Sequence, residues 1–256
     1  MAEPVEARPG DVARFVTRMT PVVERARRFS GWSFEDLNVS YSAGREPWDY
    51  EAAARVLLTG ASRVVDLGTG GGEAFSRILA ANRDVRAFAT EEWHVNAPIA
   101  VRRLRIPVVQ ASSLDLPFRA AAFDLVLSRH EAIGPAEIDR VLAPGGVFLT
   151  QQVVPDNWPE LRRYFPRKTV HPRHDIEYAA AFRSLGYVVE QQQCMYQAVF
   201  ASLEGLVFVL LVTPWDIDLD VVADAEALLA VERDLARDQG IALTEGRYLL
   251  NARKPG

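Results

Sequence analysis

The stretch Val64-Val65-Asp66-Leu67-Gly68-Thr69-Gly70-Gly71-Gly72-Glu73 decides the fold of this 256-residue chain. Its apolar first half is typical of a buried strand, and its glycines allow a tight turn in which the backbone approaches a ligand closely. Glu91 ends the next apolar run, 23 residues after Gly68, where a carboxylate can accept hydrogen bonds from both hydroxyls of a ribose. The segment therefore predicts a strand, a ligand-binding loop and a helix of an α/β sheet.

Apolar runs and helical patterns alternate around this unit. Strands are expected at residues 63–67, 85–90, 107–110, 123–128, 146–153, 187–200 and 247–252. Helices are expected at 10–30, 48–58, 73–81, 96–104, 135–142, 175–186, 202–213 and 221–235. Residues 31–47 are polar and are expected to form a loop. Because the central strands are almost continuously apolar and are separated by helices, we predict a mostly parallel, Rossmann-like sheet that is covered on both faces.

The organisation that we expect is one domain. It comprises an N-terminal helical extension or lid (1–47), a cofactor-binding core (48–200), a C-terminal helical insertion (201–246) and a final strand and tail (247–256).

Composition limits the function. Hydrophobic residues make up 49% of the chain and charged residues 25%, as in globular proteins, and the net charge of −5 makes nucleic acid an unlikely partner. Cys194 is the single cysteine, which excludes an internal disulfide and a cysteine-based zinc site. No apolar run is long enough for a membrane span and no secretory signal is visible, so a cytoplasmic protein is expected.

The charges of the glycine segment indicate which nucleotide binds there. A dinucleotide fingerprint has a third glycine where this chain has Glu73, and Asp66 adds a second carboxylate just before the loop. Carboxylates repel a pyrophosphate but attract the ammonium and sulfonium groups of S-adenosylmethionine. S-adenosylmethionine is therefore the expected cofactor.

Several segments resemble one enzyme family. They are residues 64–73, Glu91, Leu116-Pro117-Phe118, Phe123-Asp124-Leu125-Val126 and Arg140-Val141-Leu142-Ala143-Pro144-Gly145-Gly146. In this order and spacing they resemble class I S-adenosylmethionine-dependent methyltransferases, and in particular the small bacterial type-11-like members. The resemblance implies a seven-stranded sheet whose last strand is antiparallel.

The resemblance also implies roles for individual residues. Gly68, Thr69 and Gly70 would lie against the methionyl part of the cofactor, with Asp66 near its amino group and with Ser128 and Arg129 on the same side. Glu91 would bind the ribose hydroxyls, and Glu92 or Trp93 would flank the adenine. Ser112 and Ser113 stand where the family usually has an aspartate that contacts the adenine amino group.

The candidate catalytic residues are His130 and Glu131, which follow the fourth predicted strand. Methyl transfer to oxygen or nitrogen requires alignment of the acceptor and, for a group of high pKa, a general base. His130 is either this base, or a contact of the acceptor, or a residue that shapes the loop.

Two further groups of residues have alternative interpretations. Residues 162–174 contain five basic side chains and two histidines, and no carboxylate. They form either an anion-binding segment or a solvated rim of the site. His171 and His174 have no cysteine or paired acids nearby, so no metal site is predicted. The aromatic residues of the extension and the insertion either line the acceptor pocket or pack ordinarily; they are Trp32, Trp48, Tyr50, Phe208 and Trp215.

The leading hypothesis is a methyltransferase that acts on an oxygen or nitrogen atom of a small molecule. The alternatives are an RNA or protein methyltransferase and a protein that binds S-adenosylmethionine without methylating. The sequence leaves the acceptor and the oligomeric state open.

Overall fold

The computed structural model describes residues 9–256 apart from 33, 43, 83, 168–171 and 216. The α-helices are α1 (Pro9–Arg27), α2 (Tyr50–Leu58), α3 (Glu73–Leu79), α4 (Ala97–Leu104), α5 (Pro135–Val141), α6 (His174–Ser184), α7 (Leu203–Val212) and α8 (Ala225–Leu235). The strands are β1 (Val39–Ser42), β2 (Arg63–Leu67), β3 (Arg86–Thr90), β4 (Val108–Val109), β5 (Phe123–Arg129), β6 (Leu142–Val153), β7 (Val188–Phe200), β8 (Ala236–Arg237) and β9 (Gly240–Arg253). Two short 3-10 helices are η1 (Glu35–Leu37) and η2 (Pro159–Arg163).

These strands form one sheet in the order β1-β7-β9-β6-β5-β2-β3-β4, with β8 paired to β9. Strands β4, β3, β2, β5 and β6 are parallel, and β9 lies antiparallel to both β6 and β7. The predicted Rossmann-like fold with an antiparallel last strand is therefore confirmed. The seven expected strands are present, and β1 and β8 extend the sheet to nine strands among the described residues. The carboxyl ends of β2, β3 and β5 meet at one edge, where ligands bind in sheets of this kind.

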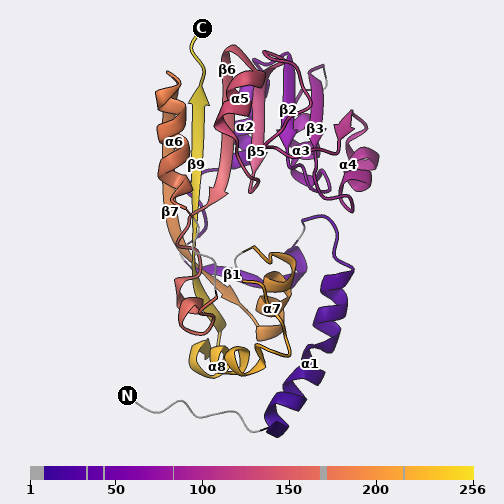
Figure 1. Ribbon diagram of the computed structural model, residues 1–256, viewed down its shortest axis with the longest axis vertical. Coiled ribbons are helices and arrows are strands. Elements are labelled where there is room, and N and C mark those ends of the chain that lie inside the picture. The colour runs from indigo at the N-terminus through magenta and orange to yellow at the C-terminus, as the bar shows by residue number, and fades with distance from the viewer. Residues whose placement is uncertain (1–8, 33, 43, 83, 168–171, 216) are drawn as a thin grey trace.

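The two longest strands, β7 and β9, run through both lobes of the molecule and join them (Figure 1). The first lobe contains β2–β6, α2–α6 and the adjoining halves of β7 and β9. The second lobe contains α1, β1, α7, α8, β8 and the remaining halves of β7 and β9. β7 and β9 pair continuously from Val188 with Arg253 to Phe200 with Ile241, whereas β6 accompanies β9 only from Arg247 onward.

Two sequence-based expectations about this region are wrong. The segment 31–47, expected as a loop, contains β1, which pairs antiparallel with the end of β7. The last strand, expected from residue 247, begins at Gly240. Both differences have the same cause, because these segments are held as strands by pairing with β7, which is distant in the sequence.

Each lobe has its own apolar core. Both faces of the first-lobe sheet are buried, one around Phe148 and Phe182 and the other around Phe75 and Leu58. The second-lobe core is formed by α1, α7, α8 and the far ends of β7 and β9; it includes Phe15, Met19, Phe200, Leu206, Leu228 and Leu243. Full burial of a side chain of this kind contributes roughly 1.5–3 kcal/mol. No helix in the described part of the chain is both long and apolar enough to cross a lipid bilayer.

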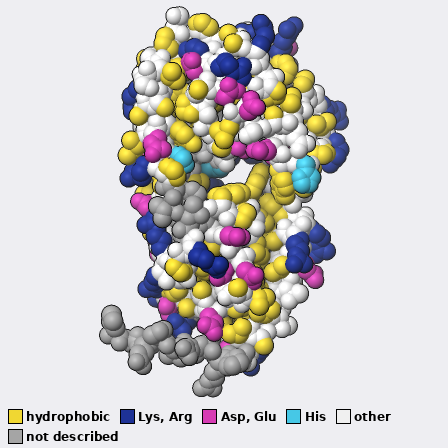
Figure 2. Space-filling model, viewed as in Figure 1, with side chains coloured by type: hydrophobic (Ala, Val, Ile, Leu, Met, Phe, Trp, Pro, Cys, Tyr) yellow, Lys and Arg dark blue, Asp and Glu magenta, His cyan; other side chains and the backbone are white. Residues whose placement is uncertain are grey.

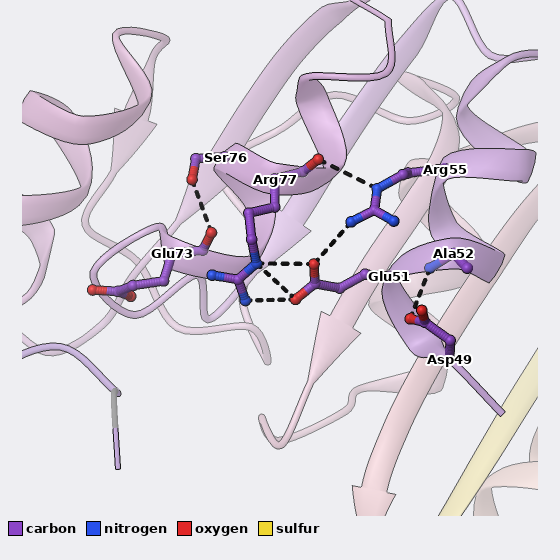
Figure 3. A network of polar contacts seen from close by, with 7 residues as sticks. All are labelled: Asp49, Glu51, Ala52, Arg55, Glu73, Ser76 and Arg77. Carbon is purple, nitrogen blue, oxygen red and sulfur yellow. Dashed lines mark hydrogen bonds and ion pairs between the residues drawn. The ribbon is translucent and has the colours of Figure 1, made fainter. Parts of the chain in front are cut away.

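A polar network fixes α3, the helix that follows the glycine segment (Figure 3). The Glu51 carboxylate on α2 accepts hydrogen bonds from Arg77 on α3, at 2.5–3.1 Å, and from Arg55, at 3.1 Å. Asp49 caps α2 by accepting the backbone N–H of Ala52 at 3.0 Å. The network joins α2 to the last turn of α3, the helix that the glycine loop enters at its opposite end.

Candidate active site

The glycine loop between β2 and α3 has a backbone that few other residues can adopt. Gly68, Gly70 and Gly72 have positive φ angles of 63°, 60° and 81°. Side chains with a Cβ are strained in this region, so the three glycines permit the turn. The backbone N–H of Thr69 donates to the carbonyl of Thr90 at 2.9 Å, which ties the loop to the end of β3.

Glu91 is the second element of the site. It is buried, and its two carboxylate oxygens accept the backbone N–H groups of Gly70 at 2.6 Å and of Trp93 at 2.9 Å. Burial raises the pKa of Glu91, and the charges of Glu131 and Glu92 also raise it, whereas the two backbone donors lower it. Glu92 and Trp93 are exposed beside it. The carboxylate therefore fixes the shape of the loop and remains at the ligand-binding edge.

Asp66 ends β2 with a buried carboxyl group. Burial raises its pKa to about 7; the charge of Glu91 also raises it, while the Thr69 hydroxyl and the charge of Arg129 lower it. A carboxyl group with this pKa changes charge near neutral pH. A bound cation would shift it to the ionised form.

Glu131 and Trp32 lie directly on the glycines. A Cβ atom at Gly68 would collide with the Glu131 carboxylate, and one at Gly70 would collide with the indole of Trp32. Glu131 also accepts the hydroxyl of Ser113 at 2.9 Å. The sequence-predicted residues Gly68, Gly70, Ser113 and Glu131 thus come together, with Glu131 against the glycine loop.

The serines predicted at the site have different environments. The Ser112 hydroxyl accepts the backbone N–H of Leu114 at 3.4 Å, within its own turn. Ser128 is buried at the end of β5, and its hydroxyl has no hydrogen-bond partner among the described residues. The usual partner of such a buried hydroxyl is an ordered water or a ligand.

His130 follows β5 with a backbone φ of 60°, a conformation uncommon for a residue with a side chain. Its N–H donates to the carbonyl of Gln151 at 2.9 Å, which holds this turn beside β6. The imidazole is exposed to solvent but surrounded by protein on several sides. This partial desolvation, followed by the charges of Arg247, Arg129 and Arg45, lowers the pKa of His130 well below its ordinary value.

His130 and Glu131 do not form a catalytic pair with each other. Glu131 lies against Gly68, whereas the groups that act electrostatically on His130 are arginines. The lowered pKa keeps the imidazole neutral at pH 7, and the burial and arginine charges that lower it also make the imidazole a weaker proton acceptor.

The aromatic residues predicted for an acceptor pocket fall into two groups. Trp32 packs against Trp215 and Trp93, with ring centroids 5.9 and 6.4 Å apart, and against Phe29, which in turn contacts Phe208. Trp48 donates its indole N–H to Gln151 at 2.8 Å, and the hydroxyl of buried Tyr50 donates to the Ser128 carbonyl at 3.2 Å. The first group connects the lobes, and the second supports β5 and β6.

The basic stretch 162–174 is largely neutralised. Its arginines form ion pairs, which are Arg162–Asp156 at 2.5 Å, Arg163–Asp234 at 3.8 Å, Arg167–Asp224 at 2.7 Å and Arg173–Asp175 at 2.9 Å. His174 stacks on Tyr178, and Lys168 and His171 lie outside the described residues.

Sequence reasoning did not identify Arg45 and Arg247, which the structure places near His130. Arg45 lies in the segment expected as a loop, and Arg247 opens an expected strand. Neither belongs to a motif, so no sequence signal marks them.

A pocket of about 310 Å³ lies away from the candidate active site, between α2 and strands β6, β7 and β9. Its lining contains none of the predicted site residues.

Comparisons with known proteins agree with this geometry. Residues 65–150 match the family described as "Methyltransferase domain". No curated protein sequence matches the chain significantly.

Three solved structures have a similar fold. A protein of unknown function from Deinococcus radiodurans R1 has a TM-score of 0.61 at 18% identity, with 93% of this chain and 99% of that chain covered. The [4+2]-cyclase SpnF has a TM-score of 0.52 at 18% identity, with 98% of both chains covered. A phosphoethanolamine N-methyltransferase from Haemonchus contortus has a TM-score of 0.50 at 16% identity, with 80% of this chain and 53% of that chain covered.

The family match covers the glycine loop, Glu91, His130 and Glu131, and it coincides with the parallel strands of the sheet. Residues 65–150 are a methyltransferase domain, and the chain has the fold of the class I S-adenosylmethionine-dependent methyltransferases.

Proposed function

We propose that this chain transfers the methyl group of S-adenosylmethionine to an oxygen or nitrogen atom of a small molecule. The observation that carries the proposal is the acidic glycine loop, in which Asp66, Glu91 and Glu131 surround Gly68 and Gly70. Three carboxyl groups at the end of a parallel sheet disfavour a pyrophosphate and favour a ligand with positive charge.

The residues present fit S-adenosylmethionine. Asp66 and Glu131 would face its ammonium and sulfonium charges, and the carboxylate of Glu91 would accept the ribose hydroxyls. The unpartnered hydroxyl of Ser128 would serve the methionyl part, and the exposed ring of Trp93 would flank the adenine. When bound, this cofactor supplies a methyl group activated by the positive sulfur.

The protein's own contribution to the reaction is to orient the acceptor, exclude water and accept a proton. His130 stands at the end of β5, next to the strand that carries Asp66, and its lowered pKa keeps it neutral at pH 7. We assign it the role of general base, a contribution worth roughly 10²–10⁴-fold. Its left-handed backbone fits the occurrence of strained residues at functional sites.

The shape of the molecule supports a small acceptor. Figure 2 shows a hollow between the two lobes, with histidine side chains near its upper rim. The second lobe, built from the N-terminal extension and the insertion, bounds this hollow from below (Figure 1). The ion-paired arginines of residues 162–173 leave little free positive charge for a nucleic acid.

The fold by itself does not fix the reaction, because proteins with different activities have a similar fold. One is the cyclase SpnF, and another is an N-methyltransferase solved with phosphomonomethylethanolamine and S-adenosylhomocysteine.

The test of the proposed function is incubation of the protein with methyl-labelled S-adenosylmethionine and fractionated cell extract. Label is expected in the fraction below about 1 kDa. Label only in RNA or protein would support the alternative acceptors, and binding of the cofactor without any transfer would indicate a non-methylating protein.

A further inference from the structure

Three arginines from distant parts of the chain act electrostatically on His130. The strand register brings two of them onto one face of the sheet, because Arg129 pairs with Gln151 on β6, Gln151 pairs with Leu249 on β9, and Arg247 lies two residues before Leu249. Arg129 ends β5, Arg45 lies between β1 and α2, and Arg247 lies on β9, and the charge of each one acts on the imidazole. Guanidinium groups repel one another. Their convergence beside a proposed catalytic group therefore calls for an explanation in terms of what they bind.

Aromatic rings hold two of these guanidinium groups. Arg45 lies 4.5 Å above the ring of Tyr41 and Arg247 lies 5.9 Å from that of Tyr196, and the two rings contact each other at 5.7 Å. Stacking on a ring leaves the N–H edge of a guanidinium accessible to carboxylate and phosphate. In Arg247 the two terminal nitrogens already donate to the Gly246 carbonyl, Asn157 and Glu245 at 2.9–3.4 Å, so its Nε is the group without an acceptor in the described part of the chain.

Several donors of the cluster lack an acceptor. The buried Nε atoms of Arg129 and Arg247 have no hydrogen-bond partner among the described residues. Arg129 has no carboxylate within 4 Å in the described part of the chain, and it lies 5.8 Å from the ring of Tyr50. An unsatisfied buried donor costs roughly 1–3 kcal/mol, and more for a charged group, so these atoms favour an incoming acceptor.

The charges within the cluster do not cancel. Arg45 pairs with Glu46 at 3.2 Å and Arg247 pairs with Glu245 at 3.1 Å, whereas Arg129 has no ion pair among the described residues. The charge of Arg129 acts on Asp66, whose pKa of about 7 leaves that carboxyl group only partly ionised at neutral pH. An anion near Arg129 would complete the balance. In a chain with net charge −5, this is a local positive region that attracts anions.

Two of the three arginines, Arg45 and Arg247, lie away from the glycine loop, whereas Arg129 also acts on Asp66 beside it. In the sheet, β9 and β2 are separated by β6 and β5, so Arg247 lies on the opposite side of His130 from Gly68. Tyr196 pairs with Glu245 on β9, and its hydroxyl donates to Glu46 at 3.4 Å, which places the Arg45 segment on the same side as Arg247. Arg45 and Arg247 therefore lie on the side of His130 that is proposed for the acceptor, with Arg129 between them and the glycine loop.

We propose that the acceptor is an anionic small molecule whose carboxylate or phosphate group binds between Arg45, Arg129 and Arg247, which brings its nucleophilic atom to His130. This inference rests on the proposed methyl transfer, since it names the substrate class of that site. The carboxylate or phosphate group of the acceptor takes no part in bond making. Its binding to the arginines orients the nucleophilic atom of the acceptor for an in-line displacement.

The test is titration of the cofactor-free protein with inorganic phosphate, at constant ionic strength and with chloride as the reference anion. Binding is followed through the histidine ring resonances, with His130 assigned from the spectrum of His130→Asn. The Arg45→Gln variant is preferred because the Arg45 side chain is 46% exposed, whereas that of Arg247 is only 13% exposed and packed in its network. Arg119→Gln is the matched control, since the exposed Arg119 precedes β5 at the opposite edge of the sheet.

We expect phosphate to shift the His130 resonance of the wild type and of Arg119→Gln. In Arg45→Gln and Arg129→Gln the affinity for phosphate should fall about tenfold or more, as expected for loss of a charge-assisted hydrogen bond. Absence of binding in the wild type, or equal affinity in Arg45→Gln, would overturn the proposal.

Calorimetry with S-adenosylhomocysteine separates this proposal from the proposed function. Arg45→Gln should retain the wild-type affinity for S-adenosylhomocysteine, and saturating phosphate should leave that affinity unchanged. Mutual exclusion of phosphate and S-adenosylhomocysteine would assign the arginines to the methionyl carboxylate and overturn the acceptor site. Failure of S-adenosylhomocysteine to bind while phosphate still does would overturn the methyltransferase proposal instead.

Discussion

The carboxylate of Glu91 accepts the backbone N–H of Gly70 at 2.6 Å, so the end of β3 determines the shape of the loop that follows β2. The two residues lie 21 positions apart and each follows one of two neighbouring parallel strands, β2 and β3. A single carboxylate thus serves both as a structural acceptor and as the proposed ligand of the ribose.

Replacement of Glu91 by alanine is expected to weaken S-adenosylhomocysteine binding at least tenfold. The variant loses charge-assisted hydrogen bonds worth roughly 1.5–3 kcal/mol each, and the loop loses its acceptor. Calorimetry measures the affinity, and circular dichroism checks the fold. Glu92→Ala, the exposed neighbour, is the matched control and should bind normally; the reverse pattern would transfer the ribose contact to Glu92.

Asp66 is expected to couple cofactor binding to pH. Its pKa of about 7 exceeds the ordinary value of 3.8, so between these values the folded state holds a proton that the unfolded state has lost. The contribution of Asp66 to stability therefore decreases as the pH rises from about 4 to 7. Asp66→Asn should be more stable than wild type at pH 8 by ~1 kcal/mol or more, since one unit of pKa corresponds to about 1.36 kcal/mol.

Binding should reverse this effect, because a cationic ligand stabilises the ionised form of Asp66. Calorimetry at pH 6.5 in buffers of different ionisation enthalpy should detect proton release when S-adenosylhomocysteine binds. Asp66→Asn should bind more weakly and release no proton. Identical heats in all buffers for the wild type would contradict this assignment.

His130→Asn is expected to reduce turnover by roughly 10²–10⁴-fold while cofactor affinity is retained. Asparagine is chosen because it tolerates the left-handed backbone that His130 adopts at φ 60°. The measurement is a comparison of turnover with S-adenosylhomocysteine affinity. Intact turnover would leave His130 with a structural role only.

The lowered pKa of His130 also predicts a pH dependence of stability. Below about pH 6.5 the unfolded state binds a proton that the folded state does not, so wild-type stability should fall as the pH decreases through this region. Denaturant unfolding of the wild type and of His130→Asn, between pH 5 and 8, should show a smaller loss in the variant. Parallel curves would contradict the assigned environment of the imidazole.

Trp32 is expected to report on cofactor binding, because its indole lies on Gly70. S-adenosylhomocysteine should change the intrinsic tryptophan fluorescence of the wild type, and Trp32→Phe should lose most of that change. Trp158→Phe is the control, since Trp158 is buried in the second-lobe core and its indole binds Glu245. A change of equal size in Trp32→Phe would place the signal at another tryptophan.

Nucleic-acid binding with a steep salt dependence is not expected. A protein that makes about 6–10 phosphate contacts loses about 10³–10⁵ in affinity between 50 and 200 mM salt. Gel-shift titrations with RNA and DNA in low salt should show no complex at micromolar protein, because the arginines of residues 162–173 are ion-paired. Tight binding that disappears at 200 mM salt would favour an RNA substrate.

The sequence by itself determined the parallel sheet and the glycine loop. Both leave local signatures, because a buried strand needs a continuous apolar run and a left-handed turn needs glycine at fixed positions such as Gly68 and Gly70. The position of Glu91 follows from the same logic, since the carboxyl ends of neighbouring parallel strands meet at one edge. The roles assigned to these residues stay predictions.

Only the tertiary structure decided the second lobe and the acceptor side of the site. β1 and the first half of β9 are strands because they pair with β7, and the short segment around β1 carries no periodic pattern of its own. The approach of Trp32 to Gly70, and that of Arg45, Arg129 and Arg247 to His130, joins residues far apart in the chain. Such contacts arise from packing between elements, so no local pattern of residues records them.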